Sequence, residues 1–291
     1  MLKIIETPRD GIQGIKKFIP TKKKVEYINQ LLKVGFDTVE VGSFVSKKAI
    51  PQLKDTDDVL KKLDLSDSHS KIMVLVGNMR GAKEAMKNDA VDHVSFPFSF
   101  SESFLQRNLN TDLEKGFKTV QDLFNLSMES GKELIVYLSM GFGNPYGDEW
   151  NMEMVEYWTG KLYDLGLRTI PLSDITGEAD TERIESVFTR LIDKFPKAEF
   201  GFHLHAPRGE WKPKVDAAFN AGIRRFDTVV GGLGGCPMTG REMMSNLDAV
   251  SLIEYLSKRE VSHHLDLKEL FQASKKAREI KAFAEDENTT K

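Results

Sequence analysis

Glu199-Phe200-Gly201-Phe202-His203-Leu204-His205 is typical of a β-strand, and it is followed by a helical pattern over 212–221 and a second apolar run from Arg225 to Val230. A strand, a helix and a second strand in this order form a βαβ unit, whose two strands run parallel. Residues i and i+2 of a strand share one face, so the His203 and His205 side chains point to the same side. The pattern predicts a parallel sheet that presents two imidazoles at the end of one strand.

The same alternation of strands and helices extends over the rest of the chain. Further strands are predicted at 3–7, 37–41, 71–76, 91–96, 133–139 and 168–172. Helices are predicted at 21–34, 57–63, 81–87, 111–128, 152–165 and 180–195, after Asn246, and at 267–284. Thr111 and Glu114 are spaced as a capping box, and the run Pro8 to Gly11 is typical of a turn. About eight such units predict an α/β fold, a TIM (β/α)8 barrel with an additional C-terminal helical segment. A doubly wound open sheet is the alternative.

Composition limits the organisation and the partners of the chain. The 291 residues carry 41 Lys+Arg against 44 Asp+Glu and no linker or low-complexity block, which predicts one domain over 1–285 and a frayed tail over 286–291. The balanced charge gives no basic field for nucleic acid or an anionic membrane. Cys236 is the single cysteine, so no internal disulfide forms, and we expect a cytoplasmic protein without a membrane span.

Charged, histidine and cysteine side chains lie at the ends of the predicted strands or in the loops after them. In a TIM barrel the active site is built at the carboxyl ends of the strands and in the loops after them. A bare His-x-His pair is more often two polar residues at a strand end, so further ligands have to come from elsewhere in the chain. The candidates at these positions are Arg9 and Asp10, Glu40, Asp174, His203 and His205, and the loop Gly231-Gly232-Leu233-Gly234-Gly235-Cys236-Pro237.

Four motifs occur in the order found in one known family: Arg9-Asp10-Gly11-Ile12-Gln13, Ser43-Phe44-Val45-Ser46, His203-Leu204-His205 and Gly232-Leu233-Gly234-Gly235-Cys236-Pro237. Together they resemble the 3-hydroxy-3-methylglutaryl-CoA lyase family, which belongs to a metal-dependent TIM-barrel superfamily with homocitrate and isopropylmalate synthases. The resemblance extends from about residue 3 to residue 257. It implies retro-Claisen cleavage of 3-hydroxy-3-methylglutaryl-CoA, or of a close 3-hydroxyacyl-CoA, and the products from 3-hydroxy-3-methylglutaryl-CoA are acetyl-CoA and acetoacetate.

The resemblance also implies a metal site. Its ligands would be Asp10, His203, His205 and Asn246, and the metal would be Mg²⁺ or Mn²⁺, with Zn²⁺ as an alternative. For Asp10 alone, a capping role in a turn is the competing interpretation.

Other residues would carry the chemistry. Arg9 would stabilise the developing enolate, and Asp174, with His203 as a relay, would move the hydroxyl proton. Cys236 resembles the family's catalytic cysteine, although a lone cysteine is more often a small buried residue. Glu40 would position Arg9 or a metal-bound water, and Gln13 would lie near the substrate; a strand-end carboxylate and a polar turn residue are the respective alternatives.

Three departures from the family pattern leave part of the function open. Ala206-Pro207-Arg208-Gly209 replaces an Asp-Thr-Tyr-Gly type of stretch, the interval from Cys236 to Asn246 is one residue longer, and Ser173-Asp174-Ile175-Thr176-Gly177 inverts the usual order. They leave open the acyl group and whether Asn246 reaches the metal. The expected partner is an acyl-CoA, with Lys47, Lys48 and Arg107 available for its phosphates, and a homodimer is expected. The alternatives are an aldolase or Claisen-type synthase acting on a 2-oxo acid, and a non-catalytic metal- or acyl-CoA-binding protein.

Overall fold

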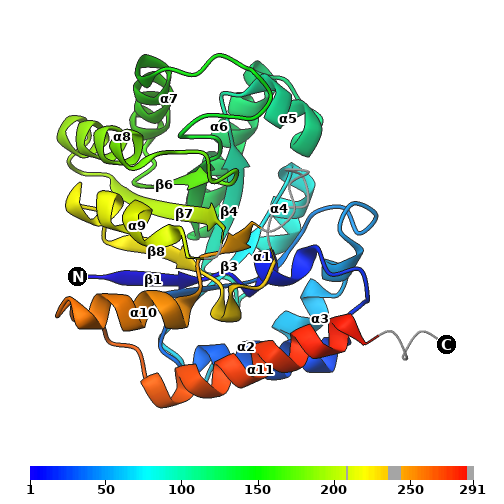
Figure 1. Cartoon of the computed structure of the whole chain (residues 1–291). Helices are drawn as coiled ribbons and strands as arrows, with labels where there is room; N and C mark the ends of the chain where they lie inside the picture. The colour runs from blue at the N-terminus through cyan, green and yellow to red at the C-terminus, as the bar shows by residue number, and fades with distance from the viewer. Residues whose placement is uncertain (208, 235–243, 287–291) are drawn as a thin grey trace.

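The computed structural model describes residues 1–207, 209–234 and 244–286. Its centre is a closed barrel of eight parallel strands, in which β1 pairs with β2 and β8, and β6 pairs with β5 and β7 (Figure 1). The predicted TIM barrel is therefore confirmed, and the open doubly wound sheet is wrong. The strands are β1 Lys3–Glu6, β2 Thr38–Ser43, β3 Lys71–Leu75, β4 His93–Phe98, β5 Glu133–Leu138, β6 Thr169–Asp174, β7 Glu199–Ala206 and β8 Arg225–Thr228.

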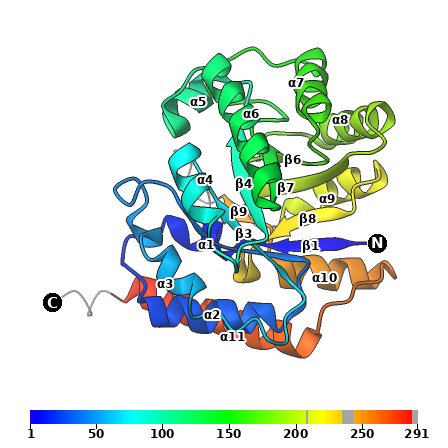
Figure 2. The same ribbon diagram turned by 180° about the vertical axis from the view of Figure 1, so that it is seen from behind.

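Helices surround the barrel, as the two opposite views in Figures 1 and 2 show. The last helix, α11, lies against α2 and against the 3-10 turn Val230–Gly232 that follows β8. No helix within the described ranges combines the length and the apolar character needed to cross a membrane. The helices are α1 Pro8–Gln13, α2 Thr21–Leu32, α3 Thr56–Leu60, α4 Met79–Ala85, α5 Glu102–Leu109, α6 Leu113–Ser130, α7 Met152–Leu165, α8 Thr181–Lys194, α9 Trp211–Asn220, α10 Ala249–Lys258 and α11 Leu267–Glu285.

The strands divide their side chains between two environments. Phe200, Phe202 and Leu204 of β7 belong to the main apolar core between the strands and the helices. Their neighbours His203 and His205 point to the barrel interior, as the period of two requires. A separate small apolar cluster fills part of that interior and consists of Ile5, Met73, Ile135 and Tyr137. The remaining interior is polar, which makes it available for chemistry.

Several local predictions were wrong, each for a physical reason. The predicted turn after β1 is the helix α1, which Pro8 begins at a position where a missing N–H costs nothing. Thr111 does not cap α6; the Asp112 side chain accepts a hydrogen bond from the Lys115 N–H at 2.8 Å instead. Helix α5 and the short strand β9, Ser245–Asn246, were not predicted. Of the expected frayed tail only Asp286 lies within the described residues, where it follows α11.

Close backbone packing holds the glycine-rich loop after β8 against α1. Gly234 has φ +76°, and a Cβ atom at this position would lie 2.8 Å from the carbonyl oxygen of Asp10. A Cβ atom on Gly11 would lie 2.6 Å from a methyl group of Val229. Glycine at both positions therefore allows the loop to lie directly beside the first helix.

Candidate active site

A pocket of about 410 Å³ opens at the carboxyl ends of the strands. Its walls come from α1, from the seven strands β2 to β8 and from the loops after them. Polar groups lie at one side, and apolar side chains such as Val45, Ile50 and Phe104 form another. The polar lining residues include Arg9, Asp10, Gln13, Glu40, Tyr137, Ser139, Ser173, His203 and Asp227.

Asp10, His203 and His205 form a buried cluster beside this pocket. One ligand atom from each residue lies within 4.8 Å of the others. The Nε2 atoms of the two histidines are 3.1 Å apart, and His205 Nε2 is 3.3 Å from Asp10 Oδ2. Two imidazoles and a carboxylate that converge in this way fit the donor preferences of a divalent cation such as Mn²⁺, Mg²⁺ or Zn²⁺.

The charge of Asp10 suits a metal ligand. Burial alone would raise its pKa, but the Arg9 guanidinium and the His205 ring outweigh burial and hold the pKa far below the usual value. Asp10 is therefore a carboxylate at neutral pH.

Asp227 of β8 orients His203. Its Oδ2 lies 3.1 Å from Nδ1 of His203, so the carboxylate accepts a hydrogen bond from the Nδ1–H group. The neutral ring then has its lone pair on Nε2, which faces the cluster. Burial disfavours the charged ring, but the hydrogen bond to Asp227 and the charges of Asp227 and Asp10 outweigh it and raise the pKa of His203. Tyr137 packs its ring edge against the same imidazole at 5.9 Å between ring centroids.

Asn246 reaches the cluster through the unpredicted strand β9. Strand β9 pairs antiparallel with β7, and Asn246 is the register partner of His205. Its Nδ2 donates to Asp10 Oδ2 at 2.9 Å and to the Leu233 carbonyl at 3.0 Å. The longer interval after Cys236 therefore leaves Asn246 beside Asp10, with its amide nitrogen toward the carboxylate.

Arg9 is fixed by acidic neighbours at the base of the pocket. Its Nε donates to Glu40 Oε2 at 2.7 Å, and its Nη1 donates to Asp10 Oδ1 at 3.0 Å. Burial would lower the pKa of Arg9, but Glu40 and Asp10 raise it, so the guanidinium stays charged. The other Glu40 oxygen, Oε1, accepts a hydrogen bond from the Ser95 hydroxyl at 2.6 Å. The position of Glu40 against Arg9 agrees with the predicted contact.

The structure describes the contacts of Gln13 but not those of Cys236. Gln13 lies one helical turn after Asp10, donates to Asp10 Oδ1 at 2.5 Å and accepts a hydrogen bond from Arg9 Nη1 at 3.2 Å. It lines the pocket and links the two neighbouring side chains. Cys236 lies outside the described residues, so its catalytic role stays a prediction.

The structure does not bring Asp174 to the pocket. Asp174 Oδ2 lies 3.3 Å from Lys214 Nζ, and Lys214 also donates to the Gly177 carbonyl at 2.5 Å. Lys214 belongs to α9, so this carboxylate points into the layer between barrel and helices. Ser173, which pairs in register with His203, lines the pocket instead. The predicted proton-transfer role of Asp174 is therefore corrected.

Comparison with known proteins identifies the family. The family model described as HMGL-like matches residues 2–276. The chain belongs to the HMGL-like family. Among its relatives, the hydroxymethylglutaryl-CoA lyase of Bacillus subtilis is 30% identical over 268 residues, which cover 92% of this chain and 89% of that protein. The mitochondrial hydroxymethylglutaryl-CoA lyase of Rattus norvegicus is 30% identical over 273 residues, which cover 94% and 83%.

Solved structures agree with this assignment. The HMG-CoA lyase of Bacillus subtilis superposes with a TM-score of 0.90 at 29% identity, covering 99% of this chain and 96% of that one. An HMG-CoA lyase from Acinetobacter baumannii, in complex with coenzyme A and 3-methylmalate, superposes with a TM-score of 0.88 at 28% identity, covering 98% and 91%. The likeness therefore extends over nearly the whole HMGL-like chain.

Sequence reasoning missed Asp227, Tyr137 and Ser173 of this HMGL-like site. Tyr137 and Asp227 lie within predicted strands, and Ser173 lies one residue beyond the predicted end of its strand. Asp227 follows Phe226, which is buried in the main core, so a period of two assigns Asp227 to the interior. A polar residue on the interior face near a strand end was the available signal.

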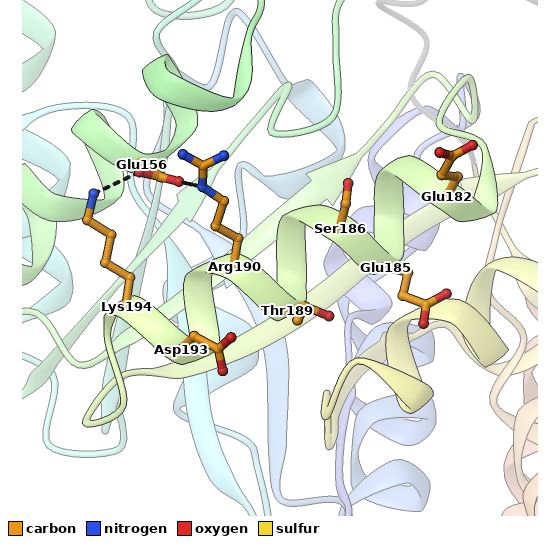
Figure 3. A pocket seen from close by; sticks show the side chains of 8 residues that line it. All are labelled: Glu156, Glu182, Glu185, Ser186, Thr189, Arg190, Asp193 and Lys194. Carbon is orange, nitrogen blue, oxygen red and sulfur yellow. Dashed lines mark hydrogen bonds and ion pairs between the residues drawn. The ribbon is translucent and has the colours of Figure 1, made fainter.

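A second hollow lies on the outer surface of the HMGL-like barrel. Figure 3 shows that all of its lining residues except Glu156 come from one face of α8. Glu156 of α7 forms ion pairs with Arg190 and with Lys194, the latter at 2.7 Å. Its negative charge is thus compensated by two cations on a helix surface far from the strand ends, which favours a structural contact between α7 and α8.

Proposed function

We propose that this chain is a divalent-metal-dependent carbon–carbon lyase that cleaves 3-hydroxy-3-methylglutaryl-CoA, or a close 3-hydroxyacyl-CoA, by retro-Claisen chemistry. The products from the first substrate are acetyl-CoA and acetoacetate. The observation that carries the proposal is the buried Asp10–His203–His205 cluster with the charged Arg9 beside it in one pocket. The names of the relatives and the coenzyme A complex of the Acinetobacter baumannii enzyme support the substrate class.

The cluster supplies the metal-binding half of the mechanism. Asp10, His203 and His205 would hold Mg²⁺ or Mn²⁺, with Zn²⁺ as an alternative, and Asn246 lies beside them. When bound, such a cation supplies a Lewis acid that makes the substrate hydroxyl easier to deprotonate. Asp227 keeps the Nδ1 proton of His203 in place, so the free Nε2 lone pair faces the metal position.

Arg9 supplies the electrostatic half. Cleavage leaves an enolate on the thioester carbonyl, and a fixed guanidinium in a water-poor pocket stabilises such a charge better than mobile solvent does. Glu40 holds the guanidinium through two nitrogen contacts, at 2.7 Å to Nε and 2.5 Å to Nη2. Arg9 is therefore oriented before substrate arrives.

The remaining roles follow from the resemblance and stay predictions. Cys236 would exchange a proton with the departing enolate carbon. Arg107, which lines the pocket with its guanidinium 4.7 Å from the Tyr146 ring centroid, and the exposed Lys47 and Lys48 are cations available for the coenzyme phosphates, although each is also an ordinary surface charge. We also propose that residues 1–285 act as one catalytic domain, in a cytoplasmic homodimer.

The decisive experiment measures acetyl-CoA release from 3-hydroxy-3-methylglutaryl-CoA. Metal-stripped protein should be inactive, Mg²⁺ or Mn²⁺ should restore release, and His203→Ala should abolish it. His69→Ala, a change of an exposed histidine, is the matched control and should behave as the wild type. Folded protein that binds the metal but releases no acetyl-CoA would refute the assignment, and turnover of a 2-oxo acid with acetyl-CoA would instead identify a Claisen-type synthase.

A further inference from the structure

Arg225 carries a buried positive charge inside the barrel, below the active site. It lies two residues before Asp227 on β8, so both side chains face the interior. Arg225 is 4% exposed, and its Nη1 donates a hydrogen bond to Glu199 Oε1 at 3.2 Å. Its Nε and Nη2 are buried without a partner among the described residues.

Two more buried polar atoms close to Arg225 also have no protein partner within the described ranges. They are Oη of Tyr137 and Oδ1 of Asp227. Tyr137 packs its ring against His203 at 5.9 Å between ring centroids, and Asp227 Oδ2 lies 3.1 Å from Nδ1 of the same imidazole, so Tyr137 and Asp227 both flank His203. The three side chains thus present N–H donors, a hydroxyl and a carboxylate oxygen to the same interior space.

Gly201 of β7 makes room for the Arg225 side chain. A Cβ atom at Gly201 would lie 2.8 Å from Cδ and 3.0 Å from Cγ of Arg225. The absence of a side chain at Gly201, between Glu199 and His203, therefore lets the Arg225 side chain lie over the neighbouring strand β7 and reach Glu199. A side chain at position 201 would therefore displace the Arg225 side chain.

Buried donors and acceptors without a protein partner are costly unless water bonds them. Residues i and i+2 of a strand are about 6.6 Å apart along the chain, a separation that one bridging water between the two head groups can span. We propose that the barrel interior contains a hydration site in which ordered water joins Arg225 and Tyr137 to Asp227 Oδ1.

The proposed site makes Arg225 a positioning residue for the metal ligands. Asp227 Oδ2 bonds His203, and water held by Arg225 on Oδ1 fixes the plane of the same carboxylate. A chain of contacts then runs from Glu199 at the start of β7 through Arg225, the proposed water and Asp227 to His203. These contacts keep the Nδ1 proton and the ring orientation of His203. This consequence rests on the proposed metal site, whereas the hydration site itself does not.

Three variants and one control test the inference. Arg225→Met removes the donors but keeps most of the length, Gly201→Ala displaces the side chain, and Arg225→Lys keeps a charged donor. Arg224→Met is the control, because Arg224 is exposed and bonds the Phe219 and Ile223 carbonyls on the outside. Far-UV circular dichroism verifies that each variant folds.

The readouts need no turnover. A high-resolution crystal structure of the full wild-type chain should contain water bonded to Arg225, Tyr137 and Asp227. Nitrogen-15 spectra of the metal-free protein should report one His203 tautomer, protonated at Nδ1, in the wild type, in Arg225→Lys and in Arg224→Met. Arg225→Met and Gly201→Ala should show mixed tautomers and about 10-fold weaker Mn²⁺ binding.

Several outcomes would overturn the inference. Direct protein–protein bonds to all of the unpartnered atoms in the crystal structure, or an anion such as chloride in place of water, would refute the hydration site. An unchanged tautomer in folded Gly201→Ala or Arg225→Met would refute the positioning role. If Arg225→Met does not fold, the wild-type crystal structure still tests the hydration site, and Gly201→Ala still tests the positioning role. Failure of the lyase assay alone leaves these results standing, so the two proposals fail separately.

Discussion

Replacing Ser95 with alanine tests how far catalysis depends on the fixed position of Arg9. The Ser95 hydroxyl donates to Glu40 Oε1 at 2.6 Å, while Glu40 Oε2 holds Arg9 at 2.7 Å. Burial raises the pKa of Glu40, and the contacts with Arg9 and Ser95 oppose that rise. Ser95→Ala removes one of these contacts and leaves a carboxylate oxygen buried without its donor.

The expected size of the effect follows from the burial of Glu40, which is 1% exposed, so water cannot replace the hydroxyl. A hydrogen bond to a charged group contributes about 1.5–3 kcal/mol. Because about 1.4 kcal/mol corresponds to a factor of ten in rate, full transmission to the transition state lowers kcat/KM by about 10- to 100-fold. The loss should appear mainly in kcat, because Arg9 acts on charge that develops during cleavage.

The assay is acetyl-CoA release with saturating Mn²⁺, accompanied by thermal unfolding. Ser95→Thr keeps the hydroxyl and should retain most of the activity. Ser127→Ala is a control for the loss of a buried hydroxyl far from the pocket, where Ser127 bonds the Phe124 carbonyl at 2.7 Å. If Ser95→Ala keeps kcat within about twofold of the wild type while its Tm falls as in Ser127→Ala, Ser95 is structural only and the reasoning is wrong.

Three further predictions concern the metal, the pH and the corrected aspartate. His205→Ala should weaken Mn²⁺ binding at least about 10-fold in calorimetry, and unchanged affinity would remove His205 from the ligand set. Burial lowers the pKa of His93 from 6.5, so the unfolded chain binds more protons there, and Tm should fall as the pH drops below about 6.5 in the wild type but less in His93→Gln. Lys214→Met leaves Asp174 buried without its cation and should cost about 3–5 kcal/mol in urea unfolding. Folded Lys214→Met should keep its kcat, because a large loss would indicate that Asp174 acts in catalysis.

The barrel was predictable from the sequence because parallel strands buried on one side by helices appear as short apolar runs at regular intervals. Helix α1 was missed because Pro8-Arg9-Asp10-Gly11 contains two residues that often mark turns. Proline at the first helical position is equally a helix start, and the helix is what carries Asp10 and Gln13 on one face, one turn apart.

The candidate site was predictable where a side chain could be assigned to a strand end, as with His203 and His205. Asp174 was misassigned because β6 ends at residue 174 and not at 172, and the register with β7 pairs Ser173 with His203. Because Asp174 still belongs to the strand, its side chain lies on the face opposite to that of Ser173, toward the helices. Asp227 and Arg225 were missed because 225–230 was interpreted only as an apolar run. Its alternation, which turns these two polar side chains to the interior beside β7, was not used.

The pairing of β1 with β8 has a consequence for synthesis of the protein. Lys3 pairs in register with Arg225, and the Thr7 amide bonds the Thr228 carbonyl at 2.8 Å. During translation β1 and its first neighbour β2 leave the ribosome long before the second neighbour, β8, which follows about 220 residues after β1. One edge of β1 therefore stays uncovered for that whole interval, when strand edges are prone to pair with other chains. Pairing of β1 with β8 is the most non-local step of folding. Substitutions at this pairing should therefore slow refolding more than equally destabilising substitutions within a single βα unit.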